Sequence, residues 1–219
     1  MLIMVNMVLN VTAQTKINEG IIVYSVTSWD KNGKEIFDSI YPRAIGVYFK
    51  DSLERTEEFQ DGRAMELVLI INTKNNNFIT LIDSNGKKVA VVNQNESNNQ
   101  ERGIQGKKSY KELPETTSIL KHKCKRIRYP DPSGFGNLNI YYTDELNIPV
   151  LNPVYFTFDE FNGFAMELEE DTPEFHLIYT VEQIRNEKVD DSKFEIPSDY
   201  HIFDQYGNEN PVIKNIKDK

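Results

Sequence analysis

The chain has 219 residues, of which 39% are hydrophobic and 27% are charged, and its formal net charge is −9. This acidic balance argues against nucleic acid as a partner, because binding to phosphates needs an excess of Lys and Arg. The single cysteine, Cys124, excludes an intrachain disulfide, and a chain of this length can bury a sizeable core without one.

The N-terminal stretch predicts export from the cytoplasm. Residues 1–13 (MLIMVNMVLNVTA) are uncharged and mostly apolar, and a polar sequence follows them. Val11-Thr12-Ala13 fits the pattern that signal peptidase recognises, which puts the cut before Gln14. We therefore expect a periplasmic or extracellular protein; the alternative is an N-terminal strand or helix that packs on the core. No later run reaches the roughly 18 apolar residues of a membrane-spanning helix, so we expect no transmembrane segment.

The rest of the chain is patterned as β-strands. Apolar residues recur with a period of two, which puts alternate side chains on one face of a strand. Asn-Gly at residues 32–33 and 85–86 predicts two hairpins. We predict a mainly β fold with a single curved antiparallel sheet or half-barrel and few short helices; a sandwich or a closed barrel gives the same periodicity. The alternating segments are Ile22–Val26, Ile45–Phe49, Met65–Ile71, Phe164–Leu168 and Phe175–Val181.

We expect one β-rich domain over residues 14–203. Within it, residues 93–114 are polar and poor in aliphatic side chains, which predicts a long mobile loop. Residues 204–219 are also polar and predict a fraying C-terminal tail.

No motif for catalysis or metal binding stands out, so we expect no enzyme activity, no catalytic residue, no metal and no other cofactor. A G-x-S-x-G nucleophile motif is absent from the sequence. His122 and Cys124 lie two positions apart and would share one side of a strand, but a zinc site needs three or four ligands. We interpret Cys124 as a small buried hydrophobic group.

A basic run interrupts this acidic chain. Lys121, Lys123 and Lys125 would line one face of a strand. One interpretation is a docking site for anionic lipid headgroups or an acidic partner. The other is a solvated face that discourages edge pairing, for which lysine is a common device.

Four segments of the second half resemble motifs of a family of exported Gram-negative envelope proteins that is still filed as a domain of unknown function. They are ETTSILKHKCKRIRY at 115–129, NIYYTDEL at 139–146, NGFAMELE at 162–169 and VDDSKFEIPSDY at 189–200. The resemblance implies an architecture like that of LolA, a periplasmic lipoprotein carrier, in which an open curved sheet shelters acyl chains on its apolar concave face.

We therefore expect a non-catalytic binding protein that holds an apolar ligand, such as an acyl chain or a lipoprotein, on the concave face. Burial of apolar surface, worth about 25 cal/mol per Å², would drive binding. The alternative is an envelope structural or protein-interaction module without a ligand cavity, which holds a protein partner at an exposed strand edge or at the basic strand. The candidate lining residues, which would equally form an ordinary closed core, are Met65, Leu67, Leu69, Phe164, Met166 and Leu168.

Overall fold

The computed structural model describes residues 14–36, 42–60, 63–75, 77–93, 110–130, 137–150 and 163–209. For residues 63–65 and 130 it describes the backbone only. The predicted signal peptide, residues 1–13, lies outside the described residues, as do residues 94–109 of the predicted loop and the end of the predicted tail.

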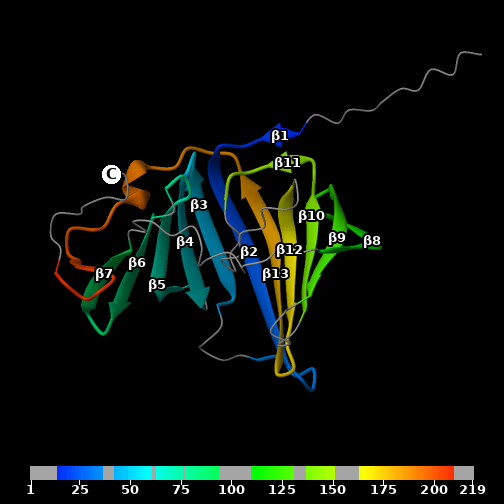
Figure 1. Cartoon of the computed structure of the whole chain (residues 1–219), viewed down its shortest axis with the longest axis horizontal. Helices are drawn as coiled ribbons and strands as arrows, with labels where there is room; N and C mark the ends of the chain where they lie inside the picture. Colours follow the sequence, from blue (N-terminus) through cyan, green and yellow to red (C-terminus); the bar gives the residue numbers. More distant parts are fainter. Residues whose placement is uncertain are drawn as a thin grey trace, which may run out of the picture.

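Twelve strands form one open sheet in the order β14-β7-β6-β5-β4-β3-β2-β13-β12-β10-β9-β8. Figure 1 shows them side by side, with β7 near one end and β8 at the other. All neighbours pair antiparallel except β14, which is parallel to β7. The prediction of a mainly β, single antiparallel sheet is confirmed. The strands are β2 (Glu19–Asp30), β3 (Ala44–Lys50), β4 (Leu53–Gln60), β5 (Arg63–Asn72), β6 (Asn77–Ser84), β7 (Lys87–Asn93), β8 (Lys111–Ile119), β9 (His122–Pro130), β10 (Asn137–Thr143), β12 (Phe164–Asp171), β13 (Phe175–Arg185) and β14 (His201–Asp204).

Three short elements complete the described fold. β1 (Thr15–Lys16) and β11 (Leu146–Asn147) form a separate parallel pair. A 3-10 helix, η1 (Asp191–Phe194), begins after Asp190, whose carboxylate accepts a hydrogen bond from the Ser192 backbone N–H at 2.8 Å. Capping of this kind is what Asp does at a helix start. The part of the chain that the structure describes contains no helix long and apolar enough to cross a membrane.

Tight turns join several neighbouring strands. The predicted hairpin at Asn85-Gly86 joins β6 to β7, and both residues have positive φ angles, 53° and 76°. Such left-handed pairs match the twist of the flanking strands, which is why Asn-Gly is favoured there. The β8–β9 turn has the same conformation at Leu120 and Lys121, with φ angles of 49° and 71°. Neither residue type favours it.

The sheet carries two cores, one on each of its faces. We call the side that carries Ile22 face A and the other side face B. Directly paired residues point to the same side, so one row on face A runs across seven strands through Ile22, Val47, Thr56, Leu69, Thr80, Val91 and Phe203. Ile22 and Val47 belong to the first core, which lies on face A and also includes Met166 and Leu168.

The second core lies on face B of β5, β6 and β7. Ile70 of β5 pairs with Ile79 of β6, and both are buried. The C-terminal segment, residues 189–196, covers these strands and contributes Val189, Phe194 and Ile196 to the core. This segment is what gives β5–β7 a hydrophobic core of their own.

Charged contacts hold the C-terminal segment against the sheet. Lys50 Nζ lies 2.7 Å from an Asp191 carboxylate oxygen. Glu57 accepts hydrogen bonds from Arg55 Nε at 2.6 Å and from Lys193 Nζ at 3.3 Å. The Lys193 ammonium also lies 4.2 Å from the centre of the Tyr48 ring. These contacts align η1 so that Phe194 points into the second core.

Part of the region predicted as a mobile loop is ordered strand. Residues 111–114 begin β8, and Asn93 ends β7. Polar composition suggested a loop, but an edge strand with one neighbour needs few buried apolar side chains. The first residues of the predicted tail are also ordered. Asp204 ends β14, and its carboxylate accepts hydrogen bonds from the backbone N–H groups of Tyr206 and Asn208.

We predict that Phe194→Ala lowers the free energy of unfolding by about 3–5 kcal/mol, because it removes a fully buried ring from the second core. Urea unfolding followed by circular dichroism measures the change. The matched control is Glu195→Ala, an exposed neighbour, which should cost less than about 0.5 kcal/mol. Equal stability of the two variants would contradict the packing described here.

Candidate functional site

Face A of β5, β6, β7 and β14 is an apolar surface that is only partly covered. Its rows are in register: Leu69, Thr80, Val91 and Phe203 form one, and Leu67, Ile82, Val89 and His201 form the next. Leu67 is 40% exposed, and the other apolar members are half-buried. We call the apolar members of this surface the β5–β14 face: Leu67, Leu69, Phe78, Ile82, Val89, Val91 and Phe203.

The exposure of the β5–β14 face follows from the position of the second core. The C-terminal segment covers the opposite side of the same strands, where Ile70, Ile79 and Leu81 are buried. Apolar side chains therefore occur on both sides of β5: Ile70 is buried on face B, whereas on face A Ile71 is buried and Leu67 and Leu69 are not. Four strands at about 4.8 Å spacing make this surface roughly 15–19 Å wide. Contiguous exposed apolar patches larger than a few hundred Å² mark interaction sites on soluble proteins.

The structure divides the six predicted lining residues between two places. Leu67 and Leu69 lie on the β5–β14 face, and the backbone of Met65 belongs to the same strand. Phe164, Met166 and Leu168 lie in the first core and are at most 4% exposed. Strands β4, β3, β2 and β13 separate β5 from β12. The two groups therefore do not form one ligand-binding surface.

The three predicted docking lysines do not share one strand face. Lys121 lies in the β8–β9 turn, while Lys123 and Lys125 lie in β9. Lys125 Nζ lies 2.5 Å from an Asp144 oxygen, and this hydrogen bond raises the lysine pKa. Lys121 and Lys123 are exposed. Because Leu120 and Lys121 form the turn, β9 begins at His122, one residue later than the sequence pattern suggested.

His122 and Cys124 belong to different environments. The His122 ring Nδ1 lies 2.7 Å from a Glu145 carboxylate oxygen at the surface. Cys124 is fully buried in the first core, as interpreted from the sequence, and burial raises the pKa of its thiol to about 11. A thiol with this pKa is protonated at neutral pH and is a poor nucleophile. Among the described residues, no three His, Cys, Asp or Glu side chains gather to hold a metal ion.

Sequence reasoning missed a polar row inside the sheet on face A of β4. Glu54 and Thr56 are 1% and 2% exposed, and the Thr56 hydroxyl lies 3.4 Å from a Glu54 oxygen. Burial, with the Glu54 charge as a smaller cause, raises the pKa of Tyr24. Burial also raises the pKa of Glu58 on the same strand. The segment LERTEEFQ contains four charged residues, a composition typical of an exposed strand, so the composition gave no sign of this burial.

A second polar network lies on face B of β9, β10, β12 and β13, on the side opposite the first core. Arg126 Nη2 lies 2.8 Å from a Glu169 oxygen, and its guanidinium lies 5.2 Å from the centre of the Tyr141 ring. Burial raises the pKa of the neighbouring Glu167, which accepts a 2.8 Å hydrogen bond from the Thr180 hydroxyl. These groups hold one another, which is typical of a structural network rather than of an open binding site.

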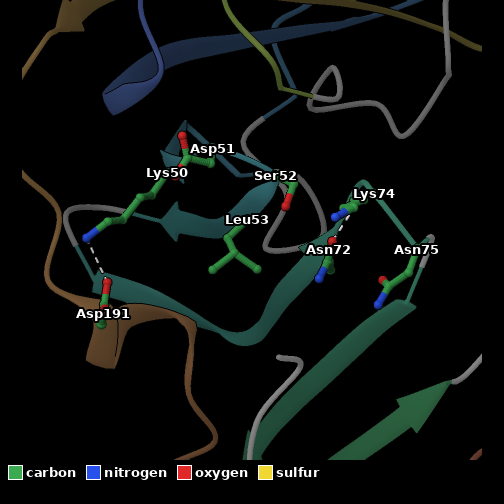
Figure 2. A pocket seen from close by; sticks show the side chains of 8 residues that line it. All are labelled: Lys50, Asp51, Ser52, Leu53, Asn72, Lys74, Asn75 and Asp191. Carbon is green, nitrogen blue, oxygen red and sulfur yellow. Dashed lines mark hydrogen bonds and ion pairs between the residues drawn. The ribbon is translucent and has the colours of Figure 1, made fainter. Parts of the chain in front are cut away.

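A polar pocket of about 540 Å³ lies at one end of β3–β5, between two turns and η1. Figure 2 shows Lys50 reaching Asp191 across it, with Leu53 between the two turns. Lys50 also lies 3.5 Å from Glu19. The pocket residues carry balancing charges: Lys50 and Lys74 against Asp51 and Asp191. Lys50 is therefore already paired within the chain, with Asp191 and Glu19.

The comparisons with known proteins support the fold alone. No family model matches the chain, and no curated protein matches it significantly. Two crystal structures of PNGF-II, in space groups C2 and P21, are similar in fold, with TM-scores of 0.51 and 0.50 and sequence identities of 15% and 14%. The matches cover 85% of this chain but only 31% and 32% of the PNGF-II chains. The chain therefore spans about a third of that protein.

We predict that Cys124 resists thiol reagents in the folded protein. Its raised pKa and its burial should slow reaction with Ellman's reagent at pH 8 by at least about a hundredfold relative to the urea-unfolded chain. The absorbance of the released thiolate measures both rates, and the unfolded chain is the internal control. Rapid labelling of the native protein would contradict the burial of this residue.

Proposed function

We propose that the chain is a non-catalytic, exported binding protein that holds a partner protein on the β5–β14 face. The observation that carries this proposal is a set of incompletely buried apolar side chains that lie in register across four neighbouring strands. This is the interaction-module function that the sequence left open beside the binding of an acyl chain.

The shape and composition of the β5–β14 face favour a protein over a small apolar ligand. Small-molecule sites are concave and bury most of their ligand, whereas this surface is one face of a sheet. Thr80 and His201 interrupt the apolar rows at regular positions. A mixture of apolar and polar groups is usual for surfaces that bind other proteins reversibly.

The packing of the first core supports the same choice. Phe164, Met166 and Leu168 contact their neighbours in the core, so they have little surface to give to an acyl chain. A carrier of the LolA type would need an open apolar surface at these positions.

The proposal predicts a discrete protein adduct from the β5–β14 face in cells. A photo-crosslinking amino acid replaces Leu67 or Val89, and the adducts are resolved by gel and mass spectrometry. Both positions should give the same protein adduct, because they lie two strands apart on one face. The same probe at Glu195, an exposed site beside the second core, is the control and should not give it.

A second variant tests whether the apolar surface itself is responsible. Leu69→Asp introduces a charge on β5, beside Leu67 of the β5–β14 face, and should reduce the adduct from position 89 at least about tenfold, since one buried charge without a partner costs more than 1.4 kcal/mol. An adduct of acyl-chain mass at position 67 would favour lipid binding instead. The absence of any adduct at both positions would refute the proposal.

Export is the other half of the proposal and has its own test. The intact mass of protein isolated from the producing cells should correspond to a chain that begins at Gln14, and the protein should fractionate outside the cytoplasm. Changing Ala13 to Arg should block processing and leave the longer chain in the cells. An unprocessed wild-type chain in the cytoplasm would contradict export without touching the binding proposal.

A further inference from the structure

Two cations lie directly opposite each other on β8 and β9, at the end of the sheet far from β7 (Figure 1). Lys111 pairs with Arg128, so the two side chains leave the sheet on the same side. Ile127, the neighbour of Arg128, is buried in the first core on face A, so Arg128 and Lys111 point to face B. Like charges at directly opposite positions destabilise a strand pair. A bound anion would remove this cost.

No carboxylate of the described residues neutralises either cation. Arg126, two positions from Arg128 on the same strand, lies 2.8 Å from a Glu169 oxygen and 3.6 Å from a Glu115 oxygen. Those two acidic side chains are therefore engaged by Arg126. Within the part of the chain that the structure describes, Arg128 bonds only to an amide, and Lys111 has no charged partner.

A buried amide holds the Arg128 guanidinium in place. Asn139 of β10 lies directly across from Arg128 and is 5% exposed. Its Oδ1 accepts a 2.8 Å hydrogen bond from Arg128 Nε. This bond orients the guanidinium without neutralising it, and it leaves the N–H groups of Nη1 and Nη2 available. An arginine that is oriented in advance loses little conformational freedom when it binds an anion.

We propose that Lys111 and Arg128 form a binding site for a phosphate monoester group. A carboxylate has two oxygens, both of which the guanidinium fork can occupy, so Lys111 would stay without a partner. A phosphate monoester has three terminal oxygens and a charge of about −1.5 to −2 at pH 7. Two of these oxygens accept hydrogen bonds from the Nη groups of Arg128, and the third accepts one from the Lys111 ammonium. The two cations thus match the charge and the acceptors of this group.

The setting of this site favours a small ligand. The chain as a whole repels anions, because its formal net charge is −9. A nucleic acid, whose many phosphates need an extended basic surface, is therefore a poor ligand. Six strands separate β9 from β5, so the site is independent of the β5–β14 face.

Proton–nitrogen correlation NMR of the full protein tests this proposal, at about pH 7.5 and at an ionic strength held constant with sodium chloride. Inorganic phosphate and glycerol 1-phosphate are titrated separately. The backbone amides of Lys111 and Arg128 and the Arg128 Nε–H signal should shift along a saturable curve. Tighter binding of glycerol 1-phosphate identifies an ester as the source of the group, and tighter binding of inorganic phosphate identifies the free ion. Acetate should bind at least about fivefold more weakly than either probe, because it leaves Lys111 without a partner.

Three variants locate the binding. Asn139→Asp gives Arg128 a carboxylate of its own chain in place of the amide and should weaken phosphate binding at least about tenfold. Lys111→Ala removes the second cation and should weaken it about three- to tenfold. The matched control is Lys123→Ala, an exposed lysine near the other end of β9, which should change the affinity less than about twofold.

The Lys111 variant keeps the test decisive even if Asn139→Asp misfolds, because Lys111 is exposed on the last strand of the described sheet. Shifts that do not saturate, or equal affinity of the Lys111→Ala and Lys123→Ala variants, would overturn the proposal. Acetate binding as tight as phosphate binding would overturn the assignment to a phosphate monoester.

Discussion

The structure depends on the C-terminal segment covering face B of β5–β7. The first core buries face A of β2, β3, β10, β12 and β13, but most of face A of β5, β6, β7 and β14 lies beyond it. Without Phe194 and its neighbours, those strands would have no fully buried side. Ion pairs hold the segment against the strands: Lys50 pairs with Asp191, and Glu57 pairs with Lys193. These contacts position the apolar side chains of the segment over the second core.

The buried face of the sheet changes from face A to face B at β4, which explains why this strand is buried on both sides. β4 is buried on both sides near its start, where Leu53 faces the second core and Glu54 faces the first. Polar groups in a sheet interior need partners, and Thr56 supplies one hydroxyl to Glu54. Beyond β4, face A is buried at Ile71 but only half-buried or exposed at Leu67, Leu69 and the apolar residues of β6, β7 and β14. The proposed partner surface is therefore a consequence of how the two cores share one sheet.

Periodicity predicted β2, β3, β5, β12 and β13 because each of these strands carries buried apolar side chains. It could not tell which side of a strand would be buried, because β5 is apolar at both parities: Leu67 and Leu69 alternate with Val68 and Ile70. The sequence pattern placed Leu67 and Met166 on one ligand-binding surface, but they lie on strands that are not neighbours. Strand order depends on long-range pairing, which periodicity does not reveal. β8 was missed for the opposite reason, since an edge strand carries little apolar signal. The basic run was misjudged at Lys121 because Leu-Lys is a rare turn pair.

The most direct test of this account is the reactivity of cysteines introduced along β5. The native Cys124 lies in β9 and is buried, so its own reaction with a thiol reagent should add little to the signal. A cysteine at position 67 or 69 should react with a bulky maleimide within minutes, and one at position 70 should react only on unfolding. A bound partner should then slow reaction at 67 and 69. Equal reactivity at 67 and 70, or fast labelling at 70 alone, would show that the buried face has been assigned to the wrong side of the strand.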